Sequence, residues 1–281
     1  MSERFTEHLR TRIDRYGPLC VGIDPSSALL ARCGLPDTAA GALDLARRVL
    51  DAAAGEVAVI KPQAAYFERF GAAGLQAIEQ LLALARAQDT PVIYDAKRGD
   101  IDATATAYGE AFFRSEAPLR CDALTVHAYL GYGALAGLVK LAAEAAGGVF
   151  VVVRSSNPQG QALQLARLGD GRTVAECLAD EISADNAHWL AGGSGCGPVG
   201  AVVGATCDDA AAIVDRLPHS YILAPGVGAQ GATCADIARR MPNARGRVLA
   251  NVSRGIFAGG TQPEQLRQTL HQLRDEASVL V

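Results

Sequence analysis

The sequence predicts a (β/α)₈ barrel, in which eight parallel strands alternate with helices and close into a ring. Eight short runs rich in Val, Ile and Leu occur along the chain, and Ala- and Leu-rich segments alternate with them. The length of 281 residues also suits such a barrel, which typically has about 250 residues. Nearly continuous apolar runs are typical of strands buried on both faces of a parallel sheet. An open, doubly wound sheet is the alternative, but it usually has roughly five to seven strands.

The strands and helices are expected in strict alternation. The expected strands are 19–24, 57–63, 91–97, 123–128, 148–156, 199–206, 221–228 and 247–255. The expected helices are 41–54, 73–87, 102–114, 131–146, 173–190, 207–217, 233–240 and 263–276. Before the first strand, Phe5, Leu9, Ile13 and Tyr16 recur at helical spacing among charged residues, which predicts an extra N-terminal helix. Because no Pro- or Ser-rich linker interrupts this pattern, we expect residues 1–281 to form one domain.

Composition and charge exclude several classes of protein. Hydrophobic residues make up 49% of the chain and charged residues 20%, which excludes a disordered or fibrous protein. The net charge of −4 gives no indication of general nucleic-acid binding. No apolar run approaches the roughly 20 residues that span a bilayer, and the N-terminus is too charged for a signal peptide. The seven cysteines are scattered without a CxxC pair, so we expect a reducing cytoplasm and neither a disulfide framework nor a zinc site.

Lysine is rare in this chain, and two of the three lysines end expected strands. The basic residues are 23 Arg and only Lys61, Lys97 and Lys140. Lys61 and Lys97 fall at the C-terminal ends of the second and third strands, where barrel enzymes place their catalytic groups. Lysine transfers protons far more readily than arginine does. The sequence therefore predicts a chemical role for these two lysines, whereas Lys140 fits an ordinary helix face.

The densest polar cluster is DAKRGDIDAT at 95–104. Residues two apart in a regular strand share a face, so Asp95 and Lys97 should lie side by side. Nearby carboxylates favour the ammonium form of Lys97, which suits a proton donor better than a Schiff-base nucleophile. A structural ion-pair network at the barrel rim is the alternative. Asp24, at the end of the first strand, would by itself more often be a capping or turn residue.

A second cluster, GVGAQG at 226–231, follows the seventh strand. It matches GxGxxG, but a dinucleotide fingerprint belongs in the first βαβ unit with an acidic residue about 20 residues further on, and this chain has neither. In barrels the loops after strands seven and eight commonly bind phosphate. The glycine backbone, including Gly228, with Gln230 and Arg254 could supply the donors, or the glycines could serve tight turns alone.

A third cluster, RSSNPQG at 154–160, begins a polar loop over about 157–172. Loops of this length are usually lids or binding loops. Ser156 and Asn157 could bind a planar heterocycle, or the segment could be an ordinary Ser/Asn/Pro turn. His127 ends the fourth strand and either lines the pocket or is structural.

Taken together, these motifs resemble one enzyme family. DAKRGDIDAT is similar to the Asp-x-Lys-x-x-Asp signature of the orotidine 5′-phosphate decarboxylases. GIDPS, IKPQAAYFERFG, DALTVHAYLG, RSSNPQG, APGVGAQG and NVSRGI follow in the family's order and look like its longer bacterial subfamily. The resemblance implies decarboxylation of orotidine 5′-monophosphate to uridine 5′-monophosphate, the last step of de novo pyrimidine synthesis, without metal or cofactor.

The resemblance also implies a role for each site residue. Asp95, Lys97, Asp100 and Lys61 would form the catalytic charge array, with Lys97 protonating C6 of the pyrimidine. Asp100 and Thr104 would enter the site of a partner subunit, which implies a homodimer with shared active sites. The remaining contacts would be Asp24 and Lys61 on ribose hydroxyls, Ser156 or the adjacent Ser155 on the pyrimidine, and Gly228, Gln230 and Arg254 on phosphate. Many family members have Gly-Arg where this chain has Ser253-Arg254.

Three other functions remain open from the sequence alone. A Mg²⁺-dependent phosphosugar barrel, either a 3-keto-gulonate-phosphate decarboxylase or a hexulose-phosphate synthase, would place a metal-binding Glu on the second strand. This chain instead has VIKPQ there, and the nearest acid is Glu68. A class I aldolase would form a Schiff base on Lys61 or Lys97. A non-catalytic barrel would only bind a nucleotide or phosphosugar.

Overall fold

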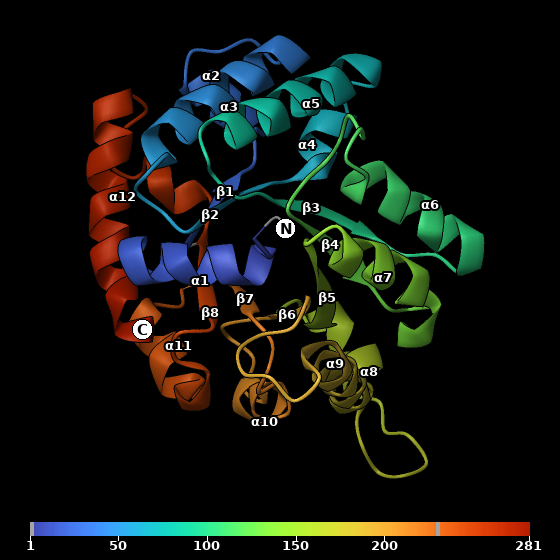
Figure 1. Cartoon of the computed structure of the whole chain (residues 1–281). Helices are drawn as coiled ribbons and strands as arrows, with labels where there is room; N and C mark the ends of the chain where they lie inside the picture. Colours follow the sequence, from blue (N-terminus) through green and yellow to red (C-terminus); the bar gives the residue numbers. More distant parts are fainter. Residues whose placement is uncertain (1–2, 229–230) are drawn as a thin grey trace.

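A computed structural model describes residues 3–228 and 231–281, and a ring of eight parallel strands lies at its centre (Figure 1). The strands are β1 Leu19–Ile23, β2 Val59–Pro62, β3 Ile93–Arg98, β4 Ala123–His127, β5 Gly148–Arg154, β6 Val199–Val203, β7 Ile222–Pro225 and β8 Val248–Val252. Their hydrogen-bonded order is β2-β1-β8-β7-β6-β5-β4-β3. Isolated bridges from Ile60 to Val92 and from Gln63 to Asp95 join β2 to β3, so the sheet nearly closes. The predicted (β/α)₈ barrel is confirmed.

Helices surround the strands (Figure 1). They are α1 Phe5–Tyr16, α2 Ser27–Arg32, α3 Ala39–Ala53, α4 Ala64–Glu68, α5 Ala72–Ala87, α6 Asp102–Phe113, α7 Ala136–Glu144, α8 Gln161–Gln164, α9 Val174–Leu190, α10 Ala210–Asp215, α11 Cys234–Arg240 and α12 Pro263–Ala277. Short 3₁₀ helices occupy Tyr132–Leu135, Pro158–Gly160, Pro242–Ala244, Arg254–Phe257 and Ser278–Leu280. The sequence did not predict α2, α4 and α8, because helices of four to six residues are too short to show a 3.6-residue period.

The N-terminal helix α1 crosses one end of the barrel (Figure 1). Phe5, Leu9 and Ile13 are buried and pack on residues from the barrel interior, such as Phe150. Arg12 is also buried, and its guanidinium donates hydrogen bonds to the carbonyls of Val57, Ala58 and Asp89. These contacts confirm the predicted extra helix and close the end of the barrel opposite the polar strand ends. Among the described residues, every helix is too short or too polar to cross a membrane.

Seven of the eight described strands end earlier than the sequence indicated, whereas β3 ends one residue later, at Arg98. β5 ends at Arg154 instead of residue 156, β7 at Pro225 instead of 228, and β8 at Val252 instead of 255. The apolar pattern continues into the loops because Val227 and Ile256 pack on the core from outside the sheet. The polar segments after these strands therefore belong to the loops at the C-terminal face of the barrel, where a (β/α)₈ enzyme carries its active site.

Candidate active site

Two lysines from neighbouring strands bind one buried carboxylate. Lys61 at the end of β2 places Nζ 2.7 Å from Oδ2 of Asp95, and Lys97 on β3 places Nζ 2.5 Å from Oδ1. The side chains of Lys61 and Asp95 are 5% and 7% exposed, whereas that of Lys97 is 49% exposed. One ammonium is therefore fixed inside the protein and the other faces the opening of the site.

Two neutral side chains complete the hydrogen bonds to Asp95. Thr125 on β4 donates its hydroxyl to Oδ1 at 2.8 Å, and the amide of Gln63 donates to Oδ2 at 3.0 Å. A carboxylate offers about four acceptor positions, and the two lysines occupy the others. The sequence analysis missed Thr125 and Gln63, because a single Thr in an apolar strand gives no signal. For Gln63, its place two residues after Lys61 was the available clue.

Burial and charge act in opposite directions on this cluster. Burial alone would raise the pKa of Asp95, but the ammonium groups of Lys61 and Lys97 and their hydrogen bonds hold that pKa below its usual range. Burial would lower the pKa of Lys61, but the charges of Asp95 and Asp24 raise it above its usual value. The Asp95 carboxylate is thus ionised and the Lys61 amine is protonated at neutral pH.

The expected proximity of Asp95 and Lys97 is present, but regular strand geometry does not produce it. Lys97 has a φ of +45°, in the left-handed region, and the register between β3 and β4 shifts between Tyr94 and Arg98. Three residues of β3 therefore lie opposite Thr125 alone. Irregular pairing of this kind redirects a side chain, which strict two-residue alternation cannot predict.

The cluster lies in the wall of a cavity of about 340 Å³ at the C-terminal end of the strands. The cavity brings together six of the site residues expected from the sequence: Asp24, Lys61, Asp95, Lys97, Ser156 and Asn157. Ser155, Gln63, Asn251 and Ser253 also line it. Within the described residues, the buried Oδ1 of Asp24 has no hydrogen-bond partner, although it faces a polar cavity. An orphaned buried carboxylate oxygen is costly unless a ligand or water donates to it.

Asp100 and Thr104, which were expected in the site, lie outside this cavity in the single chain. Asp100 accepts a hydrogen bond from the backbone N–H of Ile101, and Thr104 is exposed on the first turn of α6. In the part of the chain that the structure describes, neither residue lines the cavity with Lys61 and Lys97. The Asp-x-Lys-x-x-Asp motif is therefore divided, with its first two charged residues together and its third in the loop that leads into α6.

The expected phosphate-binding residues follow β7 and β8, and the two that the structure describes do not line the cavity. Gly228 is exposed with a φ of +71°, and its N–H bonds to the carbonyl of Ala232. Arg254 is exposed in the 3₁₀ helix after β8, next to the cavity-lining Ser253. Gln230 lies outside the described residues.

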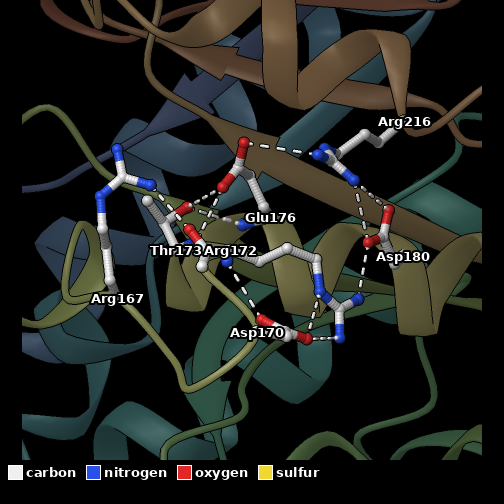
Figure 2. Close-up of polar contacts among 8 residues, drawn as sticks. Arg167, Asp170, Arg172, Thr173, Glu176, Asp180 and Arg216 are labelled. Carbon is white, nitrogen blue, oxygen red and sulfur yellow. Dashed lines mark hydrogen bonds and ion pairs between the residues drawn. The ribbon is translucent and has the colours of Figure 1, made fainter.

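The segment after β5 is more ordered than a simple polar loop. Gln164 on α8 accepts from the N–H of Ser155 at 3.0 Å and donates to the Ser155 hydroxyl at 2.8 Å. Further along, Arg172 donates to Asp180 of α9, which also pairs with Arg216, while Thr173 and Glu176 form a capping box (Figure 2). The expected loop over 157–172 is thus held at both of its ends. The lid motion expected from its length stays a prediction.

His127 packs against the loop after β3, and the acid nearest in sequence to the second strand, Glu68, is paired with an arginine. A Cβ on Gly99 would lie 2.6 Å from the ring of His127, so the imidazole packs directly against this backbone. Glu68, the nearest acid to the second strand, forms an ion pair with Arg98. No group of three or more His, Cys, Asp or Glu suitable for holding a metal occurs among residues 3–228 and 231–281.

The fold and the site define a class of protein: a (β/α)₈-barrel enzyme whose active site pairs two ammonium groups with one ionised carboxylate. Residues 17–269 match the sequence profile of the orotidine 5′-phosphate decarboxylase / HUMPS family, and the chain belongs to that family. The resemblance seen in the sequence is thereby confirmed.

Individual relatives agree with this assignment. The orotidine 5′-phosphate decarboxylase of Streptomyces coelicolor is 47% identical over 265 residues, covering 94% of each chain. A crystal structure from Streptomyces avermitilis, provisionally assigned to the same enzyme, has a TM-score of 0.93 and 44% identity over 100% of this chain and 97% of that one. The OMP decarboxylase of Leishmania donovani has a TM-score of 0.80 and 32% identity over 99% and 98% of the two chains. The prediction of a carboxy-lyase is confirmed by these matches.

Proposed function

We propose that the protein decarboxylates orotidine 5′-monophosphate to uridine 5′-monophosphate, the last step of de novo pyrimidine synthesis, without a metal or cofactor. The observation that carries the proposal is the Lys61–Asp95–Lys97 cluster in the wall of a cavity of about 340 Å³. The names of the curated relatives support the choice of substrate.

The reaction needs a positive charge and a proton at the same place. The bond between C6 and the carboxylate breaks, CO₂ leaves, and the bonding electron pair stays on C6. The ammonium of Lys97 stabilises that charge and then transfers one proton to C6, which yields the product and a neutral amine that regains its proton from solvent. The 49% exposure of the Lys97 side chain suits a group that must meet substrate and solvent in turn.

Asp95 and Lys61 serve this step differently. With its acceptor positions filled by Lys61, Lys97, Gln63 and Thr125, the Asp95 carboxylate is held in one orientation. It would lie near the substrate carboxylate, disfavour that charge in the ground state, and fix the ammonium of Lys97.

The remaining residues would bind the nucleotide. Asp24, whose buried Oδ1 lacks a partner among the described residues, would accept a ribose hydroxyl together with Lys61. Ser156 or the adjacent Ser155 would contact the pyrimidine, since both line the cavity. Gly228, Gln230 and Arg254 would bind the phosphate, and binding energy from that distant group can order the site around the reacting atoms.

No metal is needed for this chemistry, and the charges disfavour one. Each oxygen of Asp95 already binds an ammonium group, Oδ2 that of Lys61 and Oδ1 that of Lys97, and these groups would repel a divalent cation at this carboxylate. Glu68, the acid nearest in sequence to the second strand, does not line the cavity in the described part of the chain and is paired with Arg98.

A second copy of the chain would complete the site. Asp100 and Thr104 lie outside the cavity of their own chain. Ile101 next to Asp100, and Tyr129 and Leu130 in the loop after β4, expose large side chains. We propose that these loops pack against a partner subunit and place Asp100 and Thr104 in the partner's site.

The test is turnover of orotidine 5′-monophosphate in EDTA, followed by its loss of ultraviolet absorbance. The wild-type protein should consume the substrate, and Lys97→Ala should lower kcat by at least about 10³-fold. Lys140→Ala is the matched control, because this exposed lysine lies on α7 and pairs with the surface residue Glu144, away from the cavity-lining residues. Wild-type protein without turnover would overturn the proposal.

The same preparation would then separate the alternatives. Turnover of a phosphosugar that depends on added Mg²⁺ would identify the metal-dependent relatives. Borohydride trapping of a ketose phosphate on Lys61 or Lys97 would identify an aldolase. Tight nucleotide binding without any turnover would identify a binding protein.

A further inference from the structure

The irregular pairing at the end of β3 leaves one residue of β4 facing the catalytic segment. Tyr94 pairs with Leu124 and Arg98 pairs with Val126, so Asp95, Ala96 and Lys97 lie opposite a single residue, Thr125. Thr125 is 1% exposed, in a stretch of β4 that is otherwise apolar from residue 123 to 126. A hydroxyl buried in this way requires a specific set of partners.

The partners of Thr125 are both parts of the catalytic segment. Its Oγ1 accepts a hydrogen bond from the backbone N–H of Lys97 at 3.0 Å and donates to Oδ1 of Asp95 at 2.8 Å. A backbone N–H can only donate, so the one hydroxyl proton is left for the carboxylate. The same Oδ1 accepts from Nζ of Lys97 at 2.5 Å. Backbone N–H, hydroxyl, carboxylate and ammonium thus form a closed loop of hydrogen bonds.

This loop acts on a backbone conformation that Lys97 does not favour by itself. The φ of +45° brings the Cβ of an L-residue close to its own backbone, and such residues are held in place by their surroundings. Thr125 supplies that restraint at the backbone N–H. Thr125 also holds the carboxylate of Asp95, which in turn binds the side-chain ammonium of Lys97.

We propose that Thr125 is a positioning residue for Lys97, which holds the left-handed backbone of this lysine and the rotamer of Asp95 through one hydroxyl. The proposal deepens the proposed function and rests on it. Gln63 differs, because its amide bonds to Oδ2, the oxygen shared with Lys61, and has no such bond to Lys97. Thr125 should therefore control the chemical step, which uses Lys97, more than it controls nucleotide binding.

The first test is kinetic and compares Thr125→Val with Thr125→Ser. Valine keeps the shape but removes both hydrogen bonds, so kcat should fall about 10- to 100-fold, while the affinity for uridine 5′-monophosphate, measured by calorimetry, changes by less than about threefold. Serine restores the hydroxyl and should recover most of kcat. Thr90→Val is the matched control, because Thr90 is 2% exposed and its hydroxyl donates only to the carbonyl of Gln88.

The second test needs no activity. Amide hydrogen exchange at Lys97 should rise about tenfold or more in Thr125→Val and stay near the wild-type rate in Thr125→Ser and Thr90→Val. If the wild-type enzyme decarboxylates the substrate but Thr125→Val keeps its kcat, the positioning role is wrong and the proposed function stands. If the wild-type protein does not decarboxylate orotidine 5′-monophosphate, the proposed function is wrong. Independently of that result, an unchanged amide exchange rate at Lys97 in Thr125→Val would show that Thr125 does not hold the backbone of Lys97.

Discussion

Lys61 and Lys97 bind the same carboxylate of Asp95, but one is buried and the other is half-exposed. Removing each ammonium in turn therefore shows how burial changes the contribution of an ion pair to stability. Lys61→Met and Lys97→Met each delete one ammonium from Asp95 and keep an unbranched side chain. The side chain of Lys61 is 5% exposed and that of Lys97 is 49% exposed, while Asp95 is 7% exposed. Any difference in unfolding free energy between the two variants therefore reports the burial of the ion pair.

The structure sets the size of the expected effect. Removing one partner of a buried ion pair leaves an uncompensated charge and costs about 3–5 kcal/mol, so Lys61→Met should lose this much. An exposed pair contributes about 0–1 kcal/mol, and the half-exposed Lys97 should cost close to that upper value. For a chain of 281 residues, the larger loss corresponds to a decrease in Tm of roughly 5–8 °C.

The assay is urea unfolding at pH 7, followed by circular dichroism, with Lys140→Met as a surface control. We expect the order of stability to be wild type, Lys140→Met, Lys97→Met and then Lys61→Met. Equal losses for Lys61→Met and Lys97→Met would show that the buried pair gives no more stability than the exposed one. The assignment of Lys61 as the fixed cation of the site would then be refuted.

Two further predictions concern Asp95 and the expected second copy. Because the folded-state pKa of Asp95 is lowered, its contribution to stability is complete above the unfolded pKa of about 3.9 and is lost progressively as the pH falls from that value toward the lower folded-state pKa. The difference in unfolding free energy between wild type and Asp95→Asn, measured by urea titration, should therefore become smaller between about pH 5 and pH 3. A difference that stays constant over this pH range would contradict the prediction. Mixing equal amounts of inactive Lys97→Ala and inactive Asp100→Ala should restore up to about a quarter of wild-type kcat if sites are shared. About half of the dimers would then contain one copy of each variant, and one of the two sites in such a dimer carries both native residues. A mixture that stays inactive although the copies exchange, as seen by size-exclusion chromatography of tagged chains, would exclude Asp100 from a partner's site.

Much of the fold was predictable because burial on both faces leaves a strong pattern. The expected strands overlap all eight observed ones, since strands such as β1 and β6 are apolar at every position. Strand ends were placed too late where apolar residues such as Val227 pack on the core from a loop. An apolar pattern shows which residues are buried, but it does not show whether a buried residue lies in a strand or in a loop. Strand ends therefore cannot be located from this pattern alone.

The site was predictable where charge marks it and hidden where the backbone departs from regularity. Asp24, Lys61, Asp95 and Lys97 stand at strand ends and were found from that placement. Thr125 was missed, because its role depends on three residues of β3 lying opposite one residue of β4. A register shift is a property of two strands together, and a single sequence contains no direct mark of it.

In a chain that uses arginine almost everywhere, the presence of lysine at positions 61 and 97 has a physical explanation at Asp95. An arginine fork tends to use both oxygens of a carboxylate, so two arginines would compete for one aspartate. Two ammonium groups instead take one oxygen each, which leaves room for Gln63 on one oxygen and Thr125 on the other. Arginine also cannot give up a proton near neutral pH. A shared carboxylate and a proton donor therefore both require lysine at these two positions, whereas Lys140 on the exposed face of α7, 3.8 Å from Glu144, meets no such requirement.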